Sequence, residues 1–92
     1  IKGSKKLAAD GIIPEGTKNN YSFIKEHVEF SDNLEKYQRY LLSDSQTSGG
    51  LLISIPEEKF EDLNSKLLDA KCESMKIGTL ETITSDKYIK VS

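Results

Sequence analysis

The most regular pattern of apolar and polar positions lies in residues 57–70 and predicts a helix. Phe60, Leu63 and Leu67 recur at the spacing of one helical face, and most positions between them are polar. Acidic residues crowd the first turn, where the helix dipole favours anions. We expect this helix to pack its apolar stripe on a sheet.

The residues on either side of this helix predict the sheet. Residues 51–55 (LLISI) are aliphatic at four of five positions, which predicts an inner strand covered on both faces. Residues 74–83 predict a strand with a kink at Gly78, and residues 87–92 predict a closing strand.

The N-terminal part predicts a helix end followed by a loop. Residues 5–10 are typical of the last turns of a helix, with Gly11 as its left-handed cap. Residues 12–20 (IIPEGTKNN) predict a loop, because a proline, a glycine and two adjacent asparagines occur close together.

The middle of the chain predicts further helix. Residues 21–30 fit a short helix, although the same pattern leaves a strand possible. Residues 31–42 predict a helix, with capping-box spacing between Asp32 and Glu35. Together these elements predict an α+β or α/β fold, in which helices pack on a sheet to form an α-β sandwich.

Length and charge narrow the class of protein. The chain has 92 residues, which suits one domain or part of one, and it begins at Ile1 close to a helical stretch, so we expect a fragment of a longer protein. Its net charge of −2 argues against a nucleic-acid partner, which needs a concentrated basic surface. No apolar run approaches the ~20 residues that span a bilayer, and we expect a cytoplasmic protein.

Single residues offer little catalytic or metal chemistry. Cys72 is the one cysteine, so a disulfide within the chain is excluded, and no histidine lies close in sequence to activate its thiol. We expect it to act as a small apolar residue. His27 lies between Glu26 and Glu29, and we expect solvated side chains there rather than a metal site.

The polar run of residues 43–50 (SDSQTSGG) has two interpretations. Asp, Ser and Gly are common turn residues, so the run fits an ordinary connection to the next strand. Consecutive amides and hydroxyls in a glycine-containing turn can also bind an anion or a nucleotide. It is not a Walker loop, because it lacks the Gly-Lys-Ser/Thr ending and a strand rather than a helix is expected after it.

Two stretches resemble one enzyme family. DSQTSGGLLISIP resembles the DPQTSGGLL signature of selenide, water dikinase, also called selenophosphate synthetase. GIIPEGTKNN is similar to that family's G-h-x-P-G-G-T-x-x-N segment, where h is apolar. Two positions differ: Ser45 replaces the usual proline, and Glu15 replaces the first glycine of the pair. Glu15 places a negative charge beside a loop expected to lie near phosphate.

The resemblance implies that residues 1–92 are the C-terminal fragment of the family's C-terminal domain. That domain has the α-β sandwich fold of aminoimidazole ribonucleotide synthetase and is partly ferredoxin-like. The implied activity is ATP- and Mg²⁺-dependent synthesis of selenophosphate from selenide and water. The implied partners are the N-terminal ATP-binding domain of the same chain and a second copy in a homodimer. The isolated fragment is expected to hold no cofactor and to be inactive.

The resemblance also implies cofactor-binding residues in the wall of the active-site cleft, with no catalytic residue and no metal ligand among them. They are Thr17, Lys18, Asn20, Asp44, Gln46, Thr47, Ser48, Gly49 and Gly50. At least one of the two glycines is expected to have a positive φ or a close backbone neighbour, so that an alanine at Gly50 lowers stability.

Two other interpretations stay open. The chain fits the equivalent module of another enzyme of the aminoimidazole ribonucleotide synthetase superfamily, although the QTSGG motif disfavours this interpretation. It also fits an α+β interaction domain without chemistry. The longer gene product separates these, since an upstream Asp-rich nucleotide domain with a reactive Cys or selenocysteine supports the dikinase.

Overall fold

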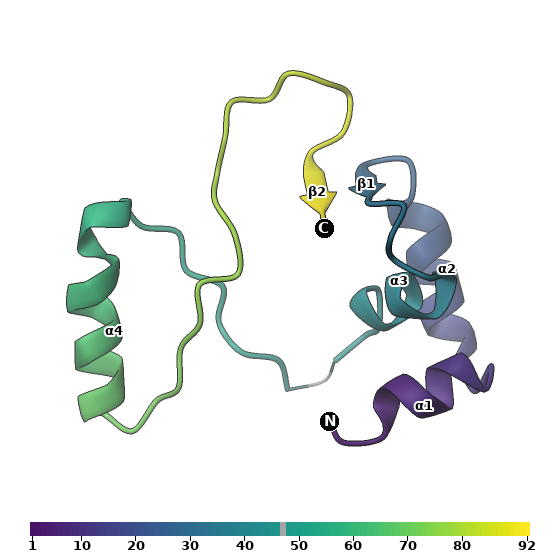
Figure 1. Cartoon of the computed structure of the whole chain (residues 1–92), viewed down its shortest axis with the longest axis horizontal. Helices are drawn as coiled ribbons and strands as arrows, with labels where there is room; N and C mark the ends of the chain where they lie inside the picture. Colours follow the sequence, from purple (N-terminus) through teal and green to yellow (C-terminus); the bar gives the residue numbers. More distant parts are fainter. Residues whose placement is uncertain (47) are drawn as a thin grey trace. The chain divides into compact units, whose positions relative to one another are not determined.

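The computed structural model describes every residue of the chain except Thr47. It divides the chain into two units, each described by itself below. The first unit comprises residues 1–48 and 82–92, and the second comprises residues 49–81. Figure 1 shows the elements of both, coloured along the sequence.

The first unit combines helices with a small sheet. Its elements, in chain order, are α1 (Ser4–Ala9), α2 (Glu15–Ile24), β1 (Val28–Phe30), α3 (Lys36–Leu42) and β2 (Ile89–Val91). The expected α+β class is therefore confirmed. Helix α3 contacts both α1 and α2.

Strands β1 and β2 pair in parallel, although 58 residues lie between Phe30 and Ile89 in the chain. Val28 lies opposite Ile89 and Phe30 opposite Val91. Backbone hydrogen bonds continue the pairing at both ends, from Tyr88 N–H to the His27 carbonyl at 2.9 Å and from Ser31 N–H to the Val91 carbonyl at 2.8 Å. The expected closing strand is confirmed at these residues.

Aromatic rings join three elements of this unit. Tyr21 on α2 meets Tyr40 on α3 edge to face, with ring centroids 5.0 Å apart. It also meets Phe30 on β1 at 5.9 Å. Arg39 lies over the Phe30 ring, with its guanidinium carbon 5.7 Å from the ring centroid. Such contacts add to the burial of the rings themselves, so the half-buried Tyr21 links α2 to both α3 and β1.

The N-terminal helices differ from expectation in where they begin. Gly11 has φ +82° and follows α1, as its predicted cap requires. Residues 15–20 were expected to be a loop, and that expectation is wrong, because Pro14 precedes the first turn and α2 starts at Glu15. Proline and an acidic residue both suit a helix start.

Helix α3 also begins later than its predicted capping box. The Glu35 backbone N–H donates to Gln38 Oε1 at 2.8 Å, so the reciprocal spacing falls on Glu35 and Gln38 instead of Asp32 and Glu35. Arg39 holds the turn before the helix, since its Nε donates to the Leu34 carbonyl at 2.9 Å.

The second unit contains the expected helix. A single 3₁₀ turn, η1 (Glu57–Lys59), leads into α4 (Phe60–Asp69), which confirms the helix predicted for residues 57–70. Lys76 Nζ pairs with Glu57 at 2.5 Å and ties the segment after α4 to its start. The hydrogen bond and positive charge of Lys76 lower the pKa of the Glu57 carboxyl.

The strands predicted at residues 51–55 and 74–83 are wrong for this structure, which has neither among the described residues. Leu51 is 93% exposed, Leu52 82% and Ile53 50%. An isolated extended segment has no strand to accept its backbone hydrogen bonds, and periodicity alone cannot supply one. The second unit is therefore one helix between two extended apolar segments, and the expected inner strand is not formed.

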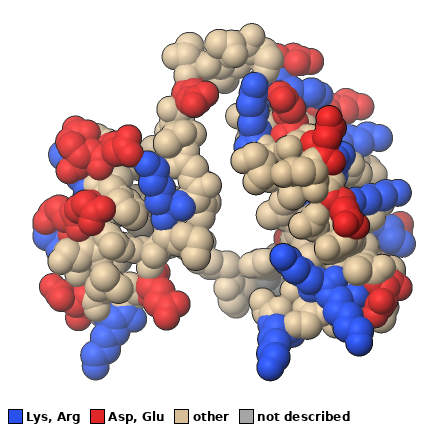
Figure 2. All heavy atoms as spheres, viewed as in Figure 1, with Lys and Arg blue, Asp and Glu red and all other residues tan. Residues whose placement is uncertain are grey.

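Charges of both signs are interspersed over the face of the two units drawn in Figure 2. This distribution agrees with the small net charge of −2. None of the helices in the described residues has the length and apolar character that a membrane crossing needs.

We predict that Tyr21→Ala lowers the free energy of unfolding by about 2 kcal/mol, because it removes a half-buried ring and two aromatic contacts. Phe23→Ala is the matched control on the same helix, since Phe23 is 76% exposed. It should change stability by about 0.5 kcal/mol or less. Urea unfolding of both variants measures the difference, and equal losses would contradict the packing role given to Tyr21.

Candidate functional site

Helix α2 presents two polar residues of the GTKNN stretch toward the end of α3. Thr17 and Asn20 lie three positions apart, so they share one side of the helix. Helix α3 ends at Leu42, and the polar run begins directly after it at Ser43. Two segments that are far apart in the sequence thus meet between α2 and the end of α3.

Thr17 is the more deeply placed of the two, with only 3% of its surface exposed. Its hydroxyl donates a hydrogen bond to Oδ1 of Asp44. A buried hydroxyl that finds no partner costs free energy, so a carboxylate at this position is matched to the threonine opposite it.

Asn20 makes two further bonds from the same face. Its Nδ2 donates to the Ser43 carbonyl at 3.1 Å and to Ser45 Oγ at 2.7 Å. We call the five residues Thr17, Asn20, Ser43, Asp44 and Ser45 the clasp. Side-chain bonds from α2 hold three consecutive residues of the polar run, so the two motifs of the sequence are parts of one arrangement.

The clasp is also attached to α3. Ser43 is 6% exposed, its backbone N–H donates to the Tyr40 carbonyl at 2.9 Å, and its Oγ donates to the Arg39 carbonyl at 2.8 Å. Sequence reasoning missed Ser43 as a site residue. The available signal was a small hydroxyl residue directly after a predicted helix, a position where serine often bonds back to the last turn.

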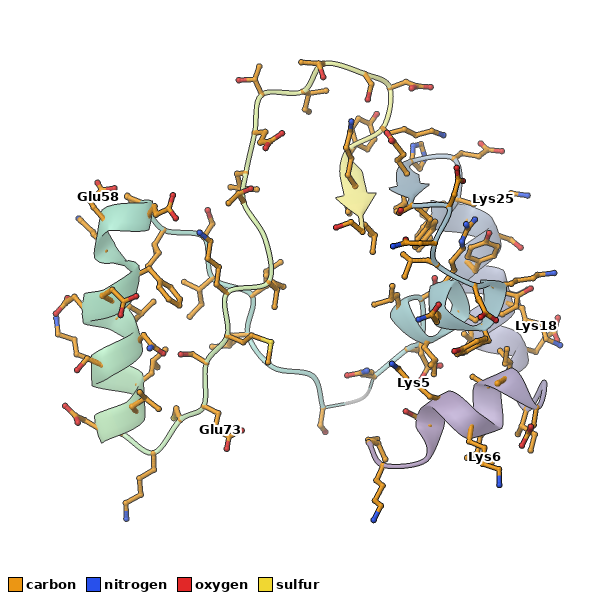
Figure 3. All side chains as sticks on the ribbon, viewed as in Figure 1. Lys5, Lys6, Lys18, Lys25, Glu58 and Glu73 are labelled. Atoms are coloured by element: carbon orange, nitrogen blue, oxygen red, sulfur yellow. The ribbon has the colours of Figure 1, made fainter. Side chains whose placement is uncertain are left out.

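Lys18 lies outside the clasp. It points outward from α2 (Figure 3), and its Nζ pairs with Glu15 Oε2 at 3.1 Å. Glu15, which replaces a glycine of the family segment, therefore neutralises the one basic side chain of this stretch. An exposed pair of this spacing contributes only about 0.3–0.5 kcal/mol, so a stronger anionic partner could displace Glu15.

The rest of the polar run is placed differently from the clasp. Gln46 and Ser48 are exposed, and Thr47 lies outside the described residues. Gly49 and Gly50 belong to the second unit. Neither glycine has a positive φ, and a Cβ added to either would meet no atom within 4 Å. A strained or crowded glycine was expected at one of these positions in the full-length enzyme, and neither feature occurs at them in this 92-residue chain.

A cavity of about 150 Å³ lies beside the clasp. Apolar side chains of α1 and the segment after it line one side, and Thr17, Tyr40 and Asp44 line the other. Small-molecule sites enclose roughly 300–1,000 Å³, so this cavity is too small for a nucleotide. The clasp shapes the protein around it and does not form a nucleotide pocket by itself.

Among the described residues, no group of three or more His, Cys, Asp or Glu side chains converges. Mg²⁺ prefers an octahedron of oxygen ligands, and Asp44 already accepts the Thr17 hydroxyl. His27 stacks on Tyr88 with centroids 5.4 Å apart. Cys72 is exposed, which differs from the apolar packing expected of it.

Comparison with known proteins matches the sequence of this chain to proteins of one name. The chain is 39% identical over 92 residues to the selenide, water dikinase of Clostridioides difficile, an overlap that covers 99% of this chain and 26% of that protein. It is 34% identical over 80 residues to the enzyme of the same name from Carboxydothermus hydrogenoformans, covering 87% of this chain and 23% of the relative. The chain is homologous to selenide, water dikinase.

A third dikinase, from a Shewanella species, is 42% identical over 77 residues, which are 84% of this chain and 21% of the relative. The chain thus spans about a quarter or less of the dikinases that it matches. No protein-family model and no solved structure matches it. The expected resemblance to selenide, water dikinase is confirmed over most of this chain.

We predict that Gly50→Ala leaves the free energy of unfolding unchanged or raises it by up to about 1 kcal/mol, because its backbone is unstrained and an alanine restricts the unfolded chain. Gly11→Ala is the matched control, since Gly11 has φ +82°. It should cost about 1 kcal/mol or more. Thermal and urea unfolding of both variants provide the measurement. A loss of stability in Gly50→Ala equal to that in Gly11→Ala would instead support the strained glycine that the sequence suggested.

Proposed function

We propose that this chain is the C-terminal part of a selenide, water dikinase, which makes selenophosphate from selenide, ATP and water. The observation that supports the proposal is the clasp: the GT-x-x-N and D-x-Q-T-S-G-G stretches bond directly to each other. Two motifs that bond to each other are more specific evidence for this assignment than either motif alone. Homology to dikinases over most of the chain agrees with this assignment.

In this proposal the chain forms part of the wall of the active-site cleft. Phosphoryl transfer depends mainly on positioning and on charge neutralisation. The N-terminal domain of the longer protein would supply the reactive residue, the metal ligands and most of the ATP site. The present residues would contribute Lys18 and the exposed polar atoms of Gln46 and Ser48, together with Thr47 and the two glycines.

The proposal includes the fold of the longer protein. The present segment would complete a C-terminal domain of the aminoimidazole ribonucleotide synthetase type, and that protein would be a homodimer. The 50–93% exposure of Leu51, Leu52 and Ile53 supports a covered position for them in the longer protein, since large contiguous apolar patches mark interaction surfaces.

The isolated 92 residues are expected to be inactive in the dikinase reaction. They offer no metal centre in the described part of the chain, and the cavity beside the clasp is smaller than a nucleotide needs. Both features suit a segment that shapes a site whose reacting groups lie in another domain.

The test uses the longer protein that contains this segment, assayed with ATP, Mg²⁺ and selenide, with selenophosphate followed by ³¹P NMR. We predict that Thr47→Val lowers turnover roughly tenfold to a hundredfold, the effect of losing one hydrogen bond to a charged ligand. The melting temperature should stay nearly unchanged. Thr79→Val is the matched control, because this exposed threonine lies outside both motifs, and it should retain full turnover.

Selenide-independent ATP consumption, or none at all, by the unmodified protein would reject the dikinase assignment. Full activity of Thr47→Val would leave the dikinase assignment unaffected. It would show that the Thr47 hydroxyl has no role in turnover.

A further inference from the structure

Ser45 occupies the position at which the DPQTSGGLL signature has proline. Proline fixes φ near −65° through its ring and so restricts the chain at that point. Serine has no such restraint, and on this ground alone the start of the polar run would be freer in this chain. The structure shows a side-chain contact at the same residue.

Asn20 Nδ2 donates to Ser45 Oγ at 2.7 Å, a bond that a proline at this position could not accept. The same nitrogen donates to the Ser43 carbonyl at 3.1 Å. Each of its two hydrogens therefore has an acceptor on the polar run. Because Asn20 sits on α2 and Ser43 is bonded to α3, the position of Ser45 is tied to two helices.

We propose that Asn20 is a positioning residue whose amide, through Ser45 Oγ, replaces the backbone restraint that a proline supplies at residue 45. Its role is to fix where the polar run leaves the clasp, so that Gln46 and the residues after it start from one place. The catalytic part of this inference rests on the proposed function, whereas the structural part does not.

Thr17 and Asp44 form the second attachment, and they explain why Asn20 can be tested separately. The Thr17–Asp44 bond holds Asp44, the residue before Ser45, and shares no atom with the two hydrogen bonds of Asn20. Loss of the Asn20 amide should therefore loosen residue 45 while Asp44 stays attached to α2.

The first experiment measures backbone motion in the 92-residue chain by ¹⁵N relaxation. The Gln46 amide should have an order parameter near the rigid value of about 0.85 in the unmodified chain and below about 0.6 in Asn20→Ala and in Ser45→Ala. Ser45→Pro should retain the rigid value. Asn19→Ala is the matched control, since it removes the adjacent amide and leaves both Asn20 bonds in place, and it should change nothing.

The second experiment measures kcat and KM for ATP in the longer protein. Asn20→Ala removes both hydrogen bonds and should lower kcat about two- to tenfold, the effect expected from losing the one bond that positions residue 45. Adding Ser45→Pro to Asn20→Ala should restore kcat to within about twofold, because the ring supplies the missing restraint. A residue needed only for folding would lower the melting temperature without being rescued by proline.

The two experiments separate the possible failures. A Gln46 amide that is mobile in the unmodified chain, or equally rigid in Asn20→Ala, would overturn the positioning role whatever the enzyme does. An unmodified longer protein without selenide-dependent turnover would reject the proposed function, and the relaxation data would still decide the role of Asn20. Failure of proline to rescue kcat would overturn the claim that the two restraints are equivalent.

Discussion

The hydrogen bond from Thr17 to Asp44 joins residues 27 positions apart and constrains how α2 meets the segment that follows α3. Thr17 is almost fully buried on α2, so its hydroxyl requires an acceptor within the protein. Asp44 can supply that acceptor only if α3 ends at Leu42 and the chain turns toward α2. This partly buried polar contact therefore links the end of α3 and the start of the polar run to α2.

This constraint changes the interpretation of the two motifs. Sequence resemblance treated Thr17, Asn20 and Asp44 together with Gln46 and Ser48 as residues of one cleft wall. In the structure the first three direct their polar atoms at one another or at the backbone of the run, whereas Gln46 and Ser48 lie outside the clasp and, like Asn20 and Asp44, are exposed. A motif of a nucleotide-dependent enzyme can thus divide into residues that hold a loop and residues that the loop presents.

Local signals in the sequence predicted local structure well. The 57–70 helix and the Gly11 cap follow from spacing, charge and backbone preference within a few residues. The strand predicted at residues 51–55 is absent because a strand needs a partner strand to pair with. The aliphatic side chains of this segment indicate only that it favours an apolar environment. The pairing of β1 with β2 and the contact of Thr17 with Asp44 join distant residues, so no local pattern specifies them. Only family resemblance suggested that the two motifs belong together.

A double-mutant cycle on Thr17→Val and Asp44→Ala, with free energies of unfolding from urea denaturation, tests the clasp most directly. The account predicts that the two losses are not additive and that their coupling is about 1–2 kcal/mol, as for a partly buried hydrogen bond to a charged group. The exposed Lys66–Asp62 pair on α4 is the control and should couple by about 0.5 kcal/mol or less. Additive losses at Thr17 and Asp44, within about 0.3 kcal/mol, would contradict the claim that this contact joins the two motifs.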